Sequence, residues 1–144
     1  MVRTEFLGEW PEDVLQIVKP VVLEWLHLVP GWCLSLHVRF EDSNENEAAA
    51  VTIDYGGRHT VMYIRPGWLQ ESLEDRHKAI LHEIAHIHVQ PIKCVFVDLC
   101  NKGIKDESFQ DFVWEQFKDA LEGSVEDLAW AFYKLSKESM SDGP

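Results

Sequence analysis

Apolar residues at helical spacing predict a first helix over residues 11–28. An apolar stripe along one side of this segment is formed by Val14, Val18, Val21, Val22 and Trp25. Pro11 suits a first helical turn, and Pro20 inside the segment is expected to kink the helix. Pro30 and Gly31 mark the end of the helix.

A different pattern follows, in which apolar and polar residues alternate as they do in half-buried strands. It predicts three strands, over residues 33–40, 48–55 and 59–65. A Gly-Gly-Arg turn separates the last two, which indicates a β-hairpin. The polar run 41–47 is a loop. We therefore expect a small three-stranded sheet.

A second helix is predicted over residues 72–90. Ser72 is the expected N-cap, because Asp75 occupies the capping-box position three residues later, although its side chain is shorter than the usual Glu. Pro91 is expected to stop the helix, since proline lacks the backbone amide proton that a helical turn requires. Residues 91–105 would then form a separate short apolar helix.

A last, long helix is predicted over residues 108–135, where apolar side chains again recur at helical spacing. Residues 136–144 are expected to form a frayed tail. The order is helix, three strands, helix and helix, so strands and helices do not alternate as they do in βαβ units. The sequence therefore predicts a single α+β domain over residues 1–144.

Charge and composition narrow the function classes. The 144 residues include 13 Lys and Arg against 25 Asp and Glu, a net charge of −12 that disfavours binding to nucleic acids and to anionic membranes. No run approaches the ~20 apolar residues that span a bilayer, and residues 1–8 carry no signal-peptide pattern. The three cysteines form no CxxC pair, as is typical of a reduced, cytoplasmic protein. No pattern fixes the oligomeric state.

The segment that carries chemistry is HEIAH, from His82 to His86, inside the predicted helix 72–90. Residues four apart lie one above the other on a helix, so both imidazoles can reach one ion from the same face. Glu83 is displaced around the helix, where it can act as general base toward a water on that metal. Apolar neighbours predict an embedded site, in which unpartnered histidines would be costly. We infer a zinc site.

The third zinc ligand is expected from the last helix, where the acidic candidates are Glu115, Glu122 and Glu126, and the last two lie one turn apart. Relative to the apolar stripe of that helix, Glu122 lies about 80° away and Glu126 about 120° away. Glu122 is therefore favoured as the ligand. Glu126 would orient a ligand histidine without binding the metal itself, as metal sites usually require. It is also the alternative third ligand.

These residues resemble the gluzincin branch of zinc metallopeptidases, and more closely the minimal zincin-like proteins of phages and prophages, distantly related to ImmA/IrrE-type peptidases. The resemblance covers residues 29–135 and rests on the three strands, on RHKAILHEIAHIHVQP and on LEGSVEDLAWAF. It implies a zincin-like fold with an HExxH active-site helix. The IrrE-like pattern aligns its last ligand with Glu126. The thermolysin-like ExxxD pattern aligns it with Glu122, and this chain has Glu where that pattern has Asp.

The expected activity is hydrolysis of peptide bonds in a peptide or protein substrate. Zinc held by His82, His86 and Glu122 would leave one position open for water, whose proton Glu83 accepts. The alternative is a non-catalytic zinc protein, in which the metal holds two helices together or presents a binding surface.

Two further features of the site are expected. The strand over residues 59–65 would offer its edge to an extended substrate, because strand addition supplies main-chain hydrogen bonds without demanding sequence. Tyr55, Arg76 and Tyr133 are the candidates for stabilising an oxyanion.

Overall fold

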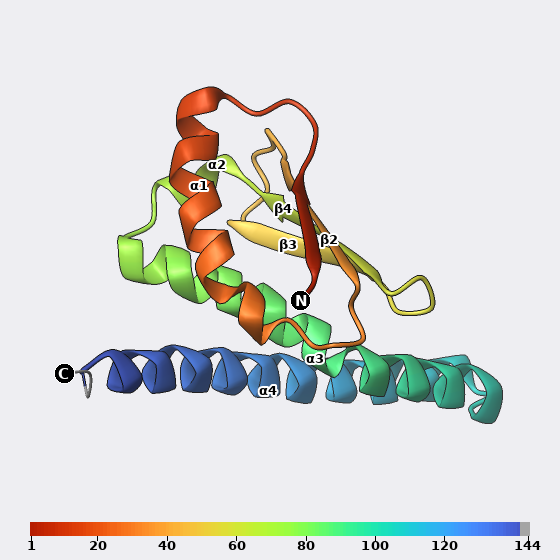
Figure 1. The fold of residues 1–144 in the computed structure, drawn as a ribbon. Coiled ribbons are helices and arrows are strands. Elements are labelled where there is room, and N and C mark those ends of the chain that lie inside the picture. Colours follow the sequence, from red (N-terminus) through yellow and green to blue (C-terminus); the bar gives the residue numbers. More distant parts are fainter. Residues whose placement is uncertain (142–144) are drawn as a thin grey trace.

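The computed structural model describes residues 1–141 and has the α+β architecture that the sequence predicts (Figure 1). An amino-terminal helix and a four-stranded sheet precede two long carboxy-terminal helices. The elements, in chain order, are β1 (Arg3–Phe6), α1 (Glu12–Trp25), the 3-10 helix η1 (Leu26–Leu28), β2 (Ser35–Phe40), β3 (Ala49–Asp54), β4 (His59–Ile64), α2 (Pro66–Leu69), α3 (Leu73–Gly103) and α4 (Glu107–Ser141).

The strands lie in the order β1-β2-β4-β3. β1 and β2 are parallel, β2 and β4 are parallel, and β3 and β4 are antiparallel. The three predicted strands are confirmed as β2, β3 and β4, and the fourth, β1, was not predicted. β3 forms one edge of the sheet, whereas β4 lies between two neighbours.

The predicted hairpin is confirmed, with Asp54 of β3 paired to His59 of β4. The turn depends on Gly57, whose amide donates a hydrogen bond of 2.9 Å to Asp54 Oδ1. A Cβ atom at position 57 would lie 2.3 Å from Asp54 Oδ2, so a larger residue would displace this carboxylate. Arg58 completes the turn in the left-handed region, with φ at 55°.

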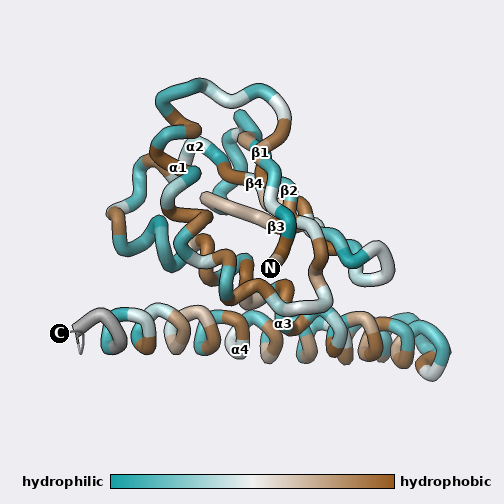
Figure 2. The backbone as a smooth tube through the Cα atoms, viewed as in Figure 1, coloured by the Kyte–Doolittle hydropathy of each residue, from teal (hydrophilic) through white to brown (hydrophobic). Residues whose placement is uncertain are grey.

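The hydrophobic core lies where α1 and α3 pack against the sheet (Figure 2). The stripe predicted for α1 is confirmed, because its members are all buried. α3 buries an apolar face against the same core, and this packing fixes the position of the helix that carries the HExxH motif. The largest fully buried side chains in this core are those of Trp68, Leu36, Met62, Ile64, Ile80, Leu81 and Ile84.

α3 begins as predicted but does not end as predicted. Ser72 is its N-cap, and the Ser72 hydroxyl accepts a hydrogen bond of 3.2 Å from the Asp75 amide. The expected stop at Pro91 is wrong, because α3 continues to Gly103 and residues 91–105 form no separate helix. Proline removes one helical hydrogen bond, and packing against α4 keeps the chain helical beyond it: the Phe96 and Phe117 rings stack 3.8 Å apart.

α4 starts at Glu107, close to the predicted position, and runs to Ser141. Residues 136–141 of the expected frayed tail are helical, and residues 142–144 lie outside the described residues. None of the helices in the described part of the chain is both long enough and apolar enough to cross a membrane.

Candidate metal centre

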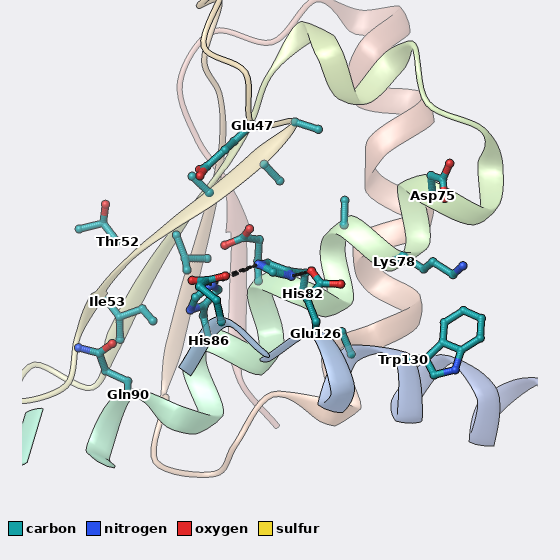
Figure 3. A pocket seen from close by; sticks show the side chains of 18 of the residues that line it. Glu47, Thr52, Ile53, Asp75, Lys78, His82, His86, Gln90, Glu126 and Trp130 are labelled. Atoms are coloured by element: carbon teal, nitrogen blue, oxygen red, sulfur yellow. Dashed lines mark hydrogen bonds and ion pairs between the residues drawn. The ribbon is translucent and has the colours of Figure 1, made fainter. Parts of the chain in front are cut away.

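His82 and His86 project from one side of α3 toward α4, as their spacing predicts (Figure 3). Their Nε2 atoms lie 3.2 Å apart and their ring centroids 4.9 Å apart. Both side chains are about one-fifth exposed, at 22% and 21%, so the pair is reachable from solvent on one side. Two imidazole nitrogens at this separation can bind one ion.

α4 brings Glu122 to the same point. Its carboxylate oxygens lie 3.2 Å from Nε2 of His86 and 3.6 Å from Nε2 of His82. With zinc–ligand bonds of about 2.0–2.1 Å, the ligand atoms of a tetrahedral site lie about 3.3–3.4 Å apart. The three separations, of 3.2, 3.2 and 3.6 Å, lie close to that spacing, with a different Glu122 oxygen facing each ring, so this donor set suits a zinc ion. The structure thus brings His82, His86 and Glu122 together.

Glu126 contacts the opposite side of the His82 ring. Its Oε1 lies 2.5 Å from Nδ1 of His82. When Nδ1 donates its proton to this carboxylate, Nε2 carries none and presents a lone pair to the site. Glu126 therefore fixes the tautomer and orientation of His82, which is the arrangement that metal-ligating histidines usually have.

Burial shifts the pKa values of one histidine and one carboxyl group in the site. Burial lowers the pKa of His86 below its ordinary value, the Glu122 carboxylate opposes this shift and His82 adds to it, and the net lowering favours the neutral ring that can bind a metal. Burial is also the main cause that raises the pKa of Glu83 to about 8. The carboxylates of Glu47 and Glu122 contribute to this rise in the pKa of Glu83, and Arg65 opposes it.

Glu83 is 7% exposed and lines the same open pocket as the two histidines. A buried carboxyl group whose pKa lies near neutrality can both accept and release a proton, which suits general acid–base chemistry. The structure therefore places a buried carboxyl group in the pocket that His82, His86 and Glu122 line.

The pocket has a volume of about 960 Å³ and lies between β3, α3 and α4. Residues 48–53 form one wall, so the free edge of the sheet runs along the site. The predicted substrate strand, over residues 59–65, is wrong: β4 is paired on both sides and has no free edge. The sequence could not decide this point, because strand order depends on long-range pairing.

The three oxyanion candidates are also wrong. Tyr55 stacks on Trp32 with ring centroids 4.8 Å apart, and Arg76 donates hydrogen bonds to the backbone carbonyls of Trp68 and Leu69. Neither they nor Tyr133 line the pocket.

The basic residues that line the pocket, among those the structure describes, are Lys78 and Lys93. Both were missed at the sequence level. Lys78 lies one turn before His82 on the same side of α3, and Lys93 lies two turns after His86. The periodicity that aligns the histidines was therefore a signal that could have identified both lysines.

His88 is not among the residues that converge on the site. Its Nε2 lies 2.6 Å from the Leu28 carbonyl oxygen, and its ring packs on Phe132 with centroids 5.5 Å apart. His88 thus ties α3 to η1 and α4. His77 accepts a hydrogen bond of 2.9 Å from the Trp25 indole nitrogen.

Unfolding of the metal-free protein at several pH values tests the environment of Glu83. The pKa of Glu83 in the folded protein is about 8, above the ordinary 4.5, so the folded state keeps a proton that the unfolded state loses between these values. The free energy of unfolding should therefore fall, relative to that of Glu83→Gln, by about 3 kcal/mol between pH 5 and pH 8. Urea titration of chelator-treated protein, followed by tryptophan fluorescence, measures the difference.

The control for this experiment is Glu71→Gln, which removes an exposed carboxylate from the rim of the same pocket. Its stability should follow that of the parent protein across the whole pH range. If the Glu83→Gln and parent curves ran parallel instead, Glu83 would be an ordinary solvated carboxylate.

Comparison with protein-family models, with curated proteins and with solved structures found no match to this chain. The function therefore has to be inferred from the site itself. There, two imidazoles and a carboxylate converge beside a buried carboxyl group, along the free edge of a sheet.

Proposed function

We propose that this protein is a zinc-dependent metallopeptidase of the zincin type. The observation that carries the proposal is the convergence of His82, His86 and Glu122, whose nearest ligand atoms lie 3.2 to 3.6 Å apart, beside Glu83. Two histidines and one carboxylate form a ligand set used by zinc peptidases, which keep a further coordination position for water or substrate.

Zinc bound by these three residues would activate a water and polarise a carbonyl group. Glu83 is the residue that accepts a proton in the pocket and passes it to the leaving amine. The free edge of β3 offers backbone donors and acceptors to an extended peptide, which suits a peptide or unfolded-protein substrate. Lys93, which replaces the earlier candidates, is the cation of the pocket available to a developing negative charge, because Lys78 is paired with Glu74 at 2.9 Å.

The alternative, a zinc protein without catalysis, would use the metal to fasten α3 to α4. Structural zinc sites are usually closed by four protein ligands and lie away from open pockets. Here three ligands border a pocket of about 960 Å³. That opening favours the enzyme over the structural role.

The proposal is tested by metal analysis together with a cleavage assay. Purified protein should contain one zinc per chain and should cleave an unfolded protein substrate, and a chelator should abolish cleavage reversibly. His82→Ala should lose both zinc and cleavage, because it removes a ligand that Glu126 orients. His27→Ala changes an exposed histidine outside the site and serves as the control.

The two functions give different results in this experiment. Stoichiometric zinc without cleavage of any unfolded substrate would support the structural role. A chain that contains no zinc and does not take up added zinc would contradict both.

A further inference from the structure

The distal halves of α3 and α4 form a helical hairpin that extends past the sheet (Figure 1). Its two helices pack on each other through the Phe96–Phe117 stack and through a hydrogen bond of 3.1 Å from the Gln110 side chain to the Cys100 carbonyl. Across residues 91–120, all of which the structure describes, Cys100 alone is buried. The hairpin therefore has little covering from the rest of the chain.

Large apolar side chains of this hairpin are exposed to solvent, and Figure 2 shows hydrophobic positions along both helices near its tip. The exposed fractions lie between 55% and 66%. We name this surface the hairpin face, and its members are Ile92, Val95, Leu99, Phe109 and Phe112.

Helical geometry places the two halves of this face on the same side of the hairpin. At 100° per residue, the α3 stripe lies about 90° from the direction of Phe96 and Cys100, which point to α4. The α4 stripe lies about 120° from the direction of Gln110 and Phe117, in the same rotational sense when each helix is viewed from its amino end. Because α3 and α4 are antiparallel, both stripes then lie on one side.

We propose that the hairpin face is a dimer interface, occupied by the same face of a second copy of this chain. Two helical hairpins joined in this way form a four-helix bundle, in which each apolar stripe packs between helices of the partner. A two-fold arrangement uses one self-complementary surface on both subunits, so no second type of patch is required.

The exposed area agrees with this occupant. Five large side chains, each more than half exposed, present roughly 500 Å² of apolar surface, at the upper end of what monomers usually leave uncovered. The same face on a second copy brings the apolar area to roughly 1,000 Å² in total, which reaches the lower bound for a specific protein–protein interface.

Charge disfavours one other occupant of the hairpin face. Residues 91–120 contain four basic and six acidic side chains, a net charge of −2, which is close to their share of the −12 of the whole chain. The same acidity disfavours an anionic membrane as the occupant.

The hairpin face lies about 120° around α3 from the side that carries His82 and His86. Dimer formation therefore leaves the pocket open in both subunits. It follows that the dimer and the metal centre can be disrupted separately.

Sedimentation velocity of the full chain between about 1 and 100 µM tests the proposal. The parent protein should sediment as a dimer, at twice the 16.7 kDa of one chain. Val95→Glu combined with Phe112→Glu should sediment as a monomer, with helical circular dichroism and zinc content unchanged. The matched control is Leu135→Glu, which charges an exposed apolar residue of α4 outside the hairpin face and should leave the dimer intact.

If the double variant fails to fold, Ile92→Lys alone serves as the second variant, because it changes one exposed side chain and should weaken the dimer at least tenfold. A parent protein that stays monomeric over the whole concentration range would overturn the proposal. So would a dimer that survives in both hairpin variants, or a monomer that binds neutral lipid vesicles through this face.

Discussion

Glu83→Gln is expected to lower kcat for peptide cleavage by about 10²–10⁴-fold while zinc content stays at one per chain. Glutamine keeps the size of the side chain but cannot accept a proton from water at neutral pH. The side chain is 7% exposed, so bulk solvent is poorly placed to replace it. The loss corresponds to about 3–5 kcal/mol in the activation barrier.

The measurement is steady-state cleavage of a quenched fluorescent peptide, with zinc determined on the same preparation. KM should change little, because Glu83 lies at the wall of the pocket and β3 supplies the proposed main-chain contacts. Glu71→Gln removes a carboxylate from the same rim and should keep the parent kcat. Equal kcat values for Glu83→Gln and the parent protein would remove Glu83 from the reaction.

The part of the site that could be predicted from the sequence is the part that depends on one helix. His82, Glu83 and His86 belong to a single stretch of α3, so their relative positions follow from helical periodicity alone. The N-cap at Ser72 is local in the same sense, because its partner is three residues away. Local interactions of this kind need no knowledge of the fold.

Pairings between distant segments could not be predicted in this way. β1 is four residues long and gains its hydrogen bonds from β2, about 30 residues later, so its own pattern is too short to indicate a strand. Strand order likewise depends on the whole sheet, and it makes β3, not β4, the edge beside the pocket. Pro91 shows the opposite case. Its local signal predicts the end of the helix, but contact with α4 keeps the chain helical beyond it.

The third ligand lies between these two cases. Helical angles on α4 favoured Glu122 over Glu126, but the register of α4 along α3 decides which carboxylate reaches the histidines. The structure sets Glu122 against Nε2 of both rings and Glu126 against Nδ1 of His82. The two nitrogens of an imidazole point in different directions, so one ion cannot be bound by Nε2 and contact the Glu126 oxygen as well.

This geometry predicts a clear difference between two matched substitutions on α4. Glu122→Gln should abolish stoichiometric zinc binding, because it replaces the charged ligand that lies near both Nε2 atoms with a weakly coordinating amide. Glu126→Gln should keep one zinc per chain and weaken its affinity by about 10–100-fold, as expected for a group that orients a ligand. Competition with a chromophoric chelator measures both affinities.

Glu115→Gln is the control for this pair, because Glu115 lies on the same helix and pairs with Lys118 at 3.0 Å, away from the pocket. It should bind zinc as tightly as the parent protein. The reverse order, with Glu126→Gln losing zinc and Glu122→Gln retaining it, would mean that α4 shifts by one turn when the metal binds. Such a shift would carry the Glu122 carboxylate away from both histidines, so the order of the two affinities reports directly on the register of α4 in the metal-bound protein.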